Sequence, residues 1–188
     1  SQGRFSGAPT VERRLPQVRL AHLSATTSAE DVHEHSHDDA HFVLATHGRY
    51  LTTAWGPETE GPVLVYNPPG VIHRDRFVAA GGYFLAVSFE PAVWRELSEV
   101  SRRVAADALR LTGPAARRAA LRLTRTLLSR DADPVTLESL GLELAGVAVD
   151  LDKLCAKAGK LADRISKLSA PLFAGNGQTD GEPVETGA

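Results

Sequence analysis

Residues 63–89 read VLVYNPPGVIHRDRFVAAGGYFLAVSF and hold three short apolar runs separated by turn residues. The runs are Val63–Tyr66, Val71–Phe77 and Tyr83–Phe89, and they are rich in the β-branched and aromatic side chains that favour strands. Residues 67–70, Asn-Pro-Pro-Gly, and the pair Gly81-Gly82 separate the runs, and such residues are typical of tight turns. Runs this short, with breaks this regular, predict β-strands joined by short connections.

The same pattern extends toward the N-terminus. Further runs occur at Val18–Thr26, Phe42–Thr46 and Tyr50–Trp55, with glycine or proline between most of them. No long helical pattern separates these runs, which argues against a doubly wound parallel sheet. The sequence therefore predicts an antiparallel β-sandwich or β-barrel over residues 1–90.

The hydrophobic pattern becomes helical after Pro91. Proline is favoured in the first turn of a helix, so Pro91 predicts a helix over Ala92–Val100, and a second short helix is predicted over Arg102–Leu111. Leucines at helical spacing predict two longer helices, at Ala115–Arg130 and Val135–Val149. The predicted fold class is therefore α+β, mainly β, with a barrel followed by C-terminal helices.

Residues 91–170 are predicted to form a helical linker or dimerisation segment. Within it, the leucine stripe of residues 114–149 predicts a homodimer face, and packing on the outer face of the barrel is an equal alternative. A last helical pattern over Leu151–Leu168 is basic, and we interpret it as an amphipathic packing helix rather than a DNA contact. Residues 171–188 have almost nothing to bury, which predicts a disordered tail.

Composition excludes several classes of protein. With 188 residues and a formal net charge of -2, the chain is not a basic nucleic-acid coat. The single cysteine, Cys155, excludes an internal disulfide and fits a reducing compartment. No apolar run approaches the roughly 20 residues that cross a bilayer. We therefore expect a cytoplasmic protein with no membrane contact.

Histidines supply the main chemical signal. His35 and His37 share one face of a strand, because side chains two residues apart point the same way. His41 has the same parity, but a straight strand would carry it about 20 Å away, so the chain must bend before it. His73 would come from another strand, positioned by the turn at residues 68–70. Four neutral imidazoles meeting inside a barrel would suit a divalent transition metal, Zn, Fe, Ni or Cu. The alternative is a solvated loop without a ligand.

The histidine spacing resembles the two cupin motifs. Residues 35–48 follow the pattern His-x-His-x3-His-x6-Gly, which resembles the first motif, and residues 68–73 follow Pro-x-Gly-x2-His, which resembles the core of the second. His41 stands where the first motif usually has Glu, and Phe77 where the second ends in Asn. The resemblance implies a cupin-type antiparallel β-barrel, also called a double-stranded β-helix or jelly roll.

A second resemblance covers residues 18–150 and is to the N-terminal sensor and dimerisation domain of AraC-type transcriptional regulators. It is carried by residues 35–50, by residues 67–77 and by residues 137–144, which resemble the helical linker. It implies a barrel that receives a small-molecule effector or a metal ion and passes the signal on as a homodimer. In that family a C-terminal double helix-turn-helix module binds DNA. Residues 151–188 are too few for it, so DNA contact would need a module largely absent here.

Arginines near the histidines complete the predicted site. Arg49, Arg74 and Arg76 could pair with a carboxylate of an effector, and with Tyr50 they form the predicted ligand-binding set. The alternative function is a small metal-dependent cupin enzyme of dioxygenase or isomerase type. No general base stands clearly beside the histidines, so no catalytic residue is predicted. A binding module with vestigial histidines and no metal is a third possibility.

Overall fold

The structure is a computed structural model that describes residues 5, 7–53, 59–60, 63–79, 81–101 and 105–147. Nine strands lie in this part of the chain: β1 Ala8–Arg14, β2 Val18–Ser24, β3 His41–His47, β4 Arg49–Thr52, β5 Thr59–Glu60, β6 Val63–Asn67, β7 Asp75–Phe77, β8 Tyr83–Phe89 and β9 Leu109–Arg110. They form a six-stranded sheet, in the order β1-β2-β8-β3-β6-β9, and a three-stranded sheet, in the order β5-β4-β7. Every pairing is antiparallel. The predicted cupin-type fold, mainly β with helices, is confirmed.

The inner strands of the large sheet, β2, β8, β3 and β6, are buried on both faces. In β3, Val43 and Ala45 point toward the small sheet and join a core that includes Phe77 of β7. Phe42 and Leu44, the alternate residues of the same strand, belong to a second core on the opposite face. One sheet therefore serves two hydrophobic cores, and its strands are almost continuously apolar for that reason.

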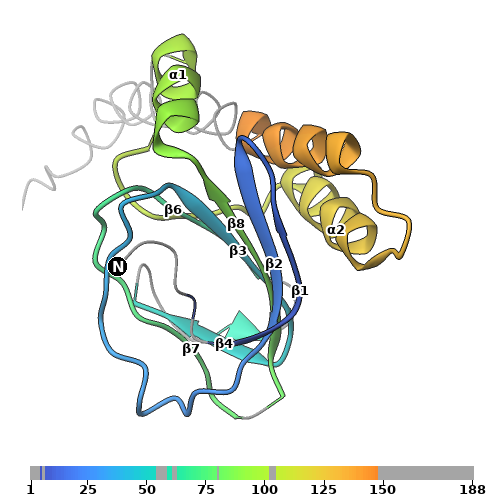
Figure 1. Cartoon of the computed structure of the whole chain (residues 1–188). Coiled ribbons are helices and arrows are strands. Elements are labelled where there is room, and N and C mark those ends of the chain that lie inside the picture. The colour runs from blue at the N-terminus through green and yellow to red at the C-terminus, as the bar shows by residue number, and fades with distance from the viewer. Residues whose placement is uncertain are drawn as a thin grey trace, which may run out of the picture. The chain divides into compact units, whose positions relative to one another are not determined.

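Helices cover the face of the large sheet that points away from β4 and β7 (Figure 1). The helices are α1 Pro91–Ser101, α2 Pro114–Leu128 and a helix over residues 134–147. These bounds confirm three of the predicted helices to within two residues. Leucines of the last two helices pack into the outer core with the sheet: Leu123, Leu127, Leu137, Leu140 and Leu144. The stripe that suggested a dimer face is thus covered by the chain's own sheet, and homodimerisation through these helices stays a prediction.

Several local features differ from the sequence-based expectations. The run Val71–Phe77 forms a strand only over β7, Asp75–Phe77. The helix predicted over Arg102–Leu111 is wrong in its described part, because β9 forms there and Leu111 N donates to Leu64 O at 2.8 Å. The open edge of β6 offers unpaired backbone groups, and a strand satisfies them where a helix would not. β1 was not predicted, because an edge strand this exposed carries no apolar run.

The barrel and the helices after it belong to one compact unit, Ser1–Asp152. The helix predicted over Leu151–Leu168 and the disordered tail predicted over residues 171–188 lie outside the described residues. None of the helices in the described part of the chain is long and apolar enough to cross a bilayer.

Candidate metal centre

Backbone hydrogen bonds hold the two histidine-bearing segments together. His35 and His73 form an isolated antiparallel bridge, in which His35 N donates to His73 O at 3.0 Å and His73 N donates to His35 O at 2.9 Å. Gly70 N donates to His37 O at 2.8 Å. Gly70 has φ 77°, a left-handed conformation that glycine adopts without strain, so this turn can bring His73 back to His35.

His41 reaches the same point from a different direction. It is the first residue of β3, and its Cα partners are Ser88 of β8 and Asn67 of β6. The chain bends at residues 38–39, immediately before it. This bend reduces the distance between His37 and His41, which a straight strand would hold far apart.

The four imidazole rings form one cluster. Their centroids are separated by 4.4 Å for His37–His41, 4.7 Å for His35–His73, 5.0 Å for His35–His37, 5.2 Å for His41–His73 and 5.3 Å for His37–His73. Three of these side chains are buried, and His35 is partly exposed. One ring nitrogen each of His35, His37 and His73 lies within 4.8 Å of the other two. The structure thus brings together all four histidines of the predicted site.

Backbone carbonyls orient three of the rings. Nδ1 of His35, of His41 and of His73 faces the carbonyl two residues earlier in the chain, at 2.9, 3.3 and 3.0 Å respectively. A carbonyl only accepts, so Nδ1 is the donor and Nε2 keeps the lone pair that a metal ion needs. His37 differs, because neither of its ring nitrogens has a hydrogen-bond partner among the described residues.

Asn67 and Asp75 form a polar network beside the cluster. Asn67 Nδ2 lies 3.2 Å from His41 Nε2 and 3.3 Å from Asp75 Oδ2, so it donates toward both. Asp75 Oδ2 also lies 3.8 Å from His73 Nε2. For His41 to bind an ion through Nε2, its hydrogen bond with Asn67 would have to open.

The histidines at the centre are held neutral. Burial, followed by the charges of the neighbouring His35 and His73, lowers the pKa of His37 from 6.5 to about 4. Burial, followed by the charges of His37 and His73, also lowers the pKa of His41 well below its usual value. Neutral imidazole is the form that binds metal ions, so at neutral pH both rings have the protonation state that a ligand needs.

We expect the metal-free protein to lose stability on acidification from pH 7 to pH 5. The folded chain accepts a proton on His37 only near pH 4, whereas the unfolded chain accepts it near pH 6.5. Between these values the unfolded state binds more protons, so falling pH favours unfolding, by roughly 2 kcal/mol from His37 alone. Thermal unfolding of the chelator-treated protein at a series of pH values measures this effect.

The His37→Gln variant is the control for this prediction, since it should lose the share of the pH dependence that comes from His37. Burial raises the pKa of Asp39. This shift makes the folded chain bind more protons than the unfolded chain, so it opposes the effect of His37 on stability. It acts at pH values closer to the usual pKa of a carboxyl group. A melting temperature that stays constant between pH 7 and pH 5 would contradict the expected burial of the histidines.

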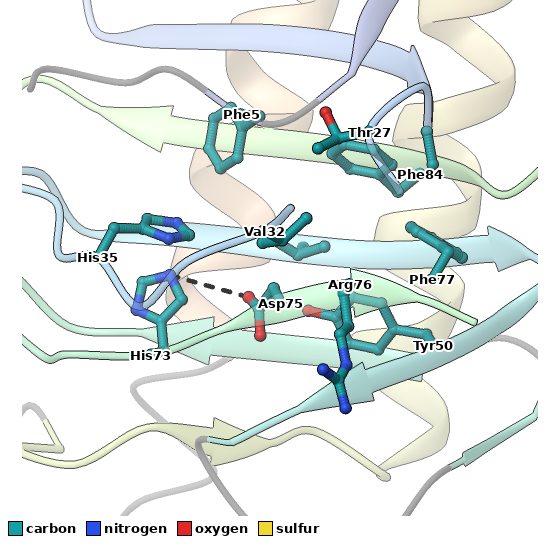
Figure 2. Close-up of a pocket in the computed structure, with 12 residues that line it drawn as sticks. Phe5, Thr27, Val32, His35, Tyr50, His73, Asp75, Arg76, Phe77 and Phe84 are labelled. Carbon is teal, nitrogen blue, oxygen red and sulfur yellow. Dashed lines mark ion pairs between the residues drawn. The ribbon is translucent and has the colours of Figure 1, made fainter. Parts of the chain in front are cut away.

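A small inner cavity adjoins His35 and His73 (Figure 2). The free space is about 30 Å³, which holds about two waters. The Tyr50 hydroxyl points toward the Asp75 carboxylate, on the same side as the His73 ring. Burial, and after it the charge of Asp75, raises the pKa of Tyr50, so the hydroxyl stays protonated.

Of the three predicted ligand-binding arginines, Arg76 lines the inner cavity, and Arg49 and Arg74 do not. Arg76 follows Asp75 in β7, so strand alternation directs its side chain to the opposite face, and Figure 2 shows the guanidinium pointing away from the histidines. Arg74 donates to the backbone carbonyls of residues 29 and 30, at 2.9 and 3.4 Å. Arg49 is exposed on β4. Of the predicted set, Tyr50 alone directs its polar group toward the described inner cavity.

Asn67 was absent from the predicted site, although the sequence of β6 contains a pattern that indicates it. Val63, Val65 and Asn67 share one face of β6, so a polar residue completes an inward-facing apolar row. A buried amide in such a row needs partners, which marks it as part of a polar site. Asp39 and Asp75 were likewise not part of the predicted site.

Comparisons with known proteins found similarities only among solved structures. No protein-family model matches the chain, and no curated protein matches it. Among solved structures, a cupin domain from Bordetella pertussis is 18% identical, with 48% of this chain and 99% of that chain covered and a TM-score of 0.34. ToxT from Vibrio cholerae is 10% identical, with 73% and 56% covered and a TM-score of 0.46. HEPD from Streptomyces albus, solved with Fe(II) bound, is 17% identical, with 77% and 41% covered and a TM-score of 0.33.

Proposed function

We propose that this chain is a sensing domain that binds a divalent transition metal through His35, His37, His41 and His73. The observation that carries the proposal is the single cluster of four rings, supplied by separate segments and buried inside the barrel. The proposed role in transcriptional regulation rests on the likeness of residues 18–150 to AraC-type sensor domains.

The state of His37 favours an ion at this point. Its side chain is only 2% exposed, and both ring nitrogens lack partners among the described residues. Leaving a buried polar group unpaired costs about 1–3 kcal/mol, so such groups in folded proteins usually have a partner. A bound cation would accept a lone pair from His37 and from the neighbouring rings, and would remove this cost.

The size of the inner cavity indicates what the site takes. About 30 Å³ admits an ion and one or two waters but no organic molecule of ordinary effector size. The ligand set of neutral imidazoles suits Zn, Fe, Ni or Cu. We therefore favour the metal ion itself as the signal, or as the anchor for a small ligand that coordinates it.

We expect the purified protein to bind one equivalent of Zn(II) or Co(II), and His37→Ala to weaken this binding about 100-fold or more. Loss of a central ligand leaves the remaining rings with an incomplete coordination sphere, and 100-fold corresponds to about 2.7 kcal/mol. Competition with a chromophoric chelator measures the affinity for Zn(II), and the visible absorption of Co(II) reports its coordination.

His47→Ala is the matched control, because His47 is exposed at the end of β3 and outside the cluster. Its affinity should equal that of the unmodified protein. Less than a tenth of an equivalent of metal after mild purification, together with no binding on titration, would instead support a binding module with vestigial histidines.

A metal-dependent enzyme is the second candidate, and one observation favours it. Tyr50 and Asp75 place a phenol and a carboxylate next to His73, where they could exchange protons with a ligand on the ion. Consumption of O2 by the iron-loaded protein with a small aromatic or diketone compound would replace the sensing role with catalysis.

A further inference from the structure

A second set of candidate ligands lies in the same cluster and includes a carboxylate. One ligand atom each of His37, Asp39 and His41 lies within 4.8 Å of the other two. This set shares His37 with the set of His35, His37 and His73, and it adds a carboxylate that the four-histidine site lacks. An ion in the cluster is therefore within reach of an oxygen ligand.

The Asp39 carboxylate is directed at the cluster. Its side chain is 18% exposed, and Oδ1 lies 3.9 Å from His37 Nδ1. Neither of these two atoms has a hydrogen-bond partner among the described residues, and the His37 side chain is 98% buried. Two unpaired polar atoms that face each other across this gap leave room for a group that binds both.

Charge balance gives a reason for a carboxylate in this position. Four neutral imidazoles leave the double positive charge of a divalent ion without compensation in a buried site. One carboxylate ligand would halve that charge. Asp75 also lies near the cluster, but it belongs to neither three-residue set and accepts a hydrogen bond from Asn67.

Asp39 also lines a wide cavity. This cavity has a volume of about 320 Å³, roughly ten times that of the inner cavity, and Asp38, Asp39 and Ser88 are among its lining residues. Ser88 and His41 are direct cross-strand partners, so the floor of this cavity adjoins the histidines.

From these observations we propose that Asp39 is a ligand of the metal ion, on the side of the cluster that faces this cavity. The proposal rests on the proposed function, since it names one more ligand of the same ion. It also implies an ion with mixed nitrogen and oxygen ligands, a combination that raises the affinity for Mn(II) and Fe(II) relative to an all-imidazole site.

The test compares Asp39→Asn with Asp38→Asn, which removes the same charge one residue away. Asp38 is exposed and lines the same cavity, so it controls for the general electrostatic attraction of cations. We expect Asp39→Asn to weaken Mn(II) binding about 10–100-fold, measured by titration with detection of free Mn(II) by electron paramagnetic resonance. Asp38→Asn should change the affinity no more than about twofold, because its charge is screened by solvent.

The visible spectrum of bound Co(II) provides a second measurement. It should change in Asp39→Asn and stay unchanged in Asp38→Asn. If Asp39→Asn does not fold, Asp39→Glu keeps the charge but moves the oxygens, and it should still alter the Co(II) spectrum. Equal spectra and equal Mn(II) affinities in the Asp39 and Asp38 variants would overturn the proposal.

The outcomes separate this proposal from the proposed function. If the unmodified protein binds no metal, the metal site itself is wrong and Asp39 is not a ligand. If the unmodified protein binds metal and His37→Ala weakens binding while Asp39→Asn does not, the histidine site stands and only the role of Asp39 is wrong.

Discussion

Replacing Phe42 with alanine should lower the free energy of unfolding by about 3–5 kcal/mol. The Phe42 side chain is fully buried, and its ring centroid lies 5.1 Å from that of Tyr66, 5.8 Å from Phe89 and 6.3 Å from Trp94. Trp94 belongs to α1, so this aromatic group joins the large sheet to the helices. Alanine would leave a cavity that three strands and a helix cannot close. Urea unfolding of the metal-free protein measures the loss.

Leu128→Ala is the matched control for Phe42, because it also truncates an apolar side chain but at the end of α2, where Leu128 is 48% exposed. Its effect should stay within about 0.5 kcal/mol of the unmodified protein. A loss below about 1 kcal/mol in Phe42→Ala would show that the outer face of the large sheet is not packed against the helices.

Gly82→Ala should destabilise the barrel by about 3 kcal/mol, at the upper end of the effects of overpacking. A Cβ at this position would clash with Phe77 Cδ1 and would lie 2.5 Å from Phe77 Cγ. The Phe77 ring is buried in the inner core, with its centroid 5.4 Å from Tyr50 and 5.7 Å from Phe84, so it cannot move aside freely. The backbone is also held, because Ala25 N donates to Gly82 O at 2.8 Å. The midpoint of thermal or urea unfolding measures the cost.

Gly146→Ala provides the comparison, since Gly146 is helical and an added Cβ there would meet no atom within 4 Å. Alanine loses less conformational entropy than glycine when it enters a helix, so this variant should be more stable by about 0.5–1 kcal/mol. Equal effects of the two substitutions would contradict the close approach of Gly82 to Phe77.

Local signals were sufficient to predict much of this architecture. Turn residues at 67–70 and 81–82 separate strands that the structure confirms, and Pro91 and Pro114 are the first residues of α1 and α2. Such signals depend on near neighbours in the chain, so they survive without knowledge of the fold. The same reasoning failed for residues 109–111, because their strand forms only where the edge of β6 is available.

The spacing of the histidines indicated a common site. Residues 36–40 form no strand in the structure, so His35, His37 and His41 meet through the bend before His41 and not through a shared strand face. Arg76 was placed in the predicted ligand set by its nearness in sequence. In the structure it has the opposite parity to Asp75, and although it lines the cavity its guanidinium points away from the histidines.

Short antiparallel strands, helices after residue 90 and a cluster of histidines could be predicted from the amino-acid sequence of this protein alone. Alternation, turns and helical spacing are local properties of a chain. Tertiary structure alone decided that the inner strands of the large sheet are buried on both faces, that the leucine stripe packs on this sheet, and that Asp39, Asn67 and Asp75 surround the histidines. These features depend on which strands become neighbours. The pairing of strands is determined by the burial of apolar surface over the whole chain.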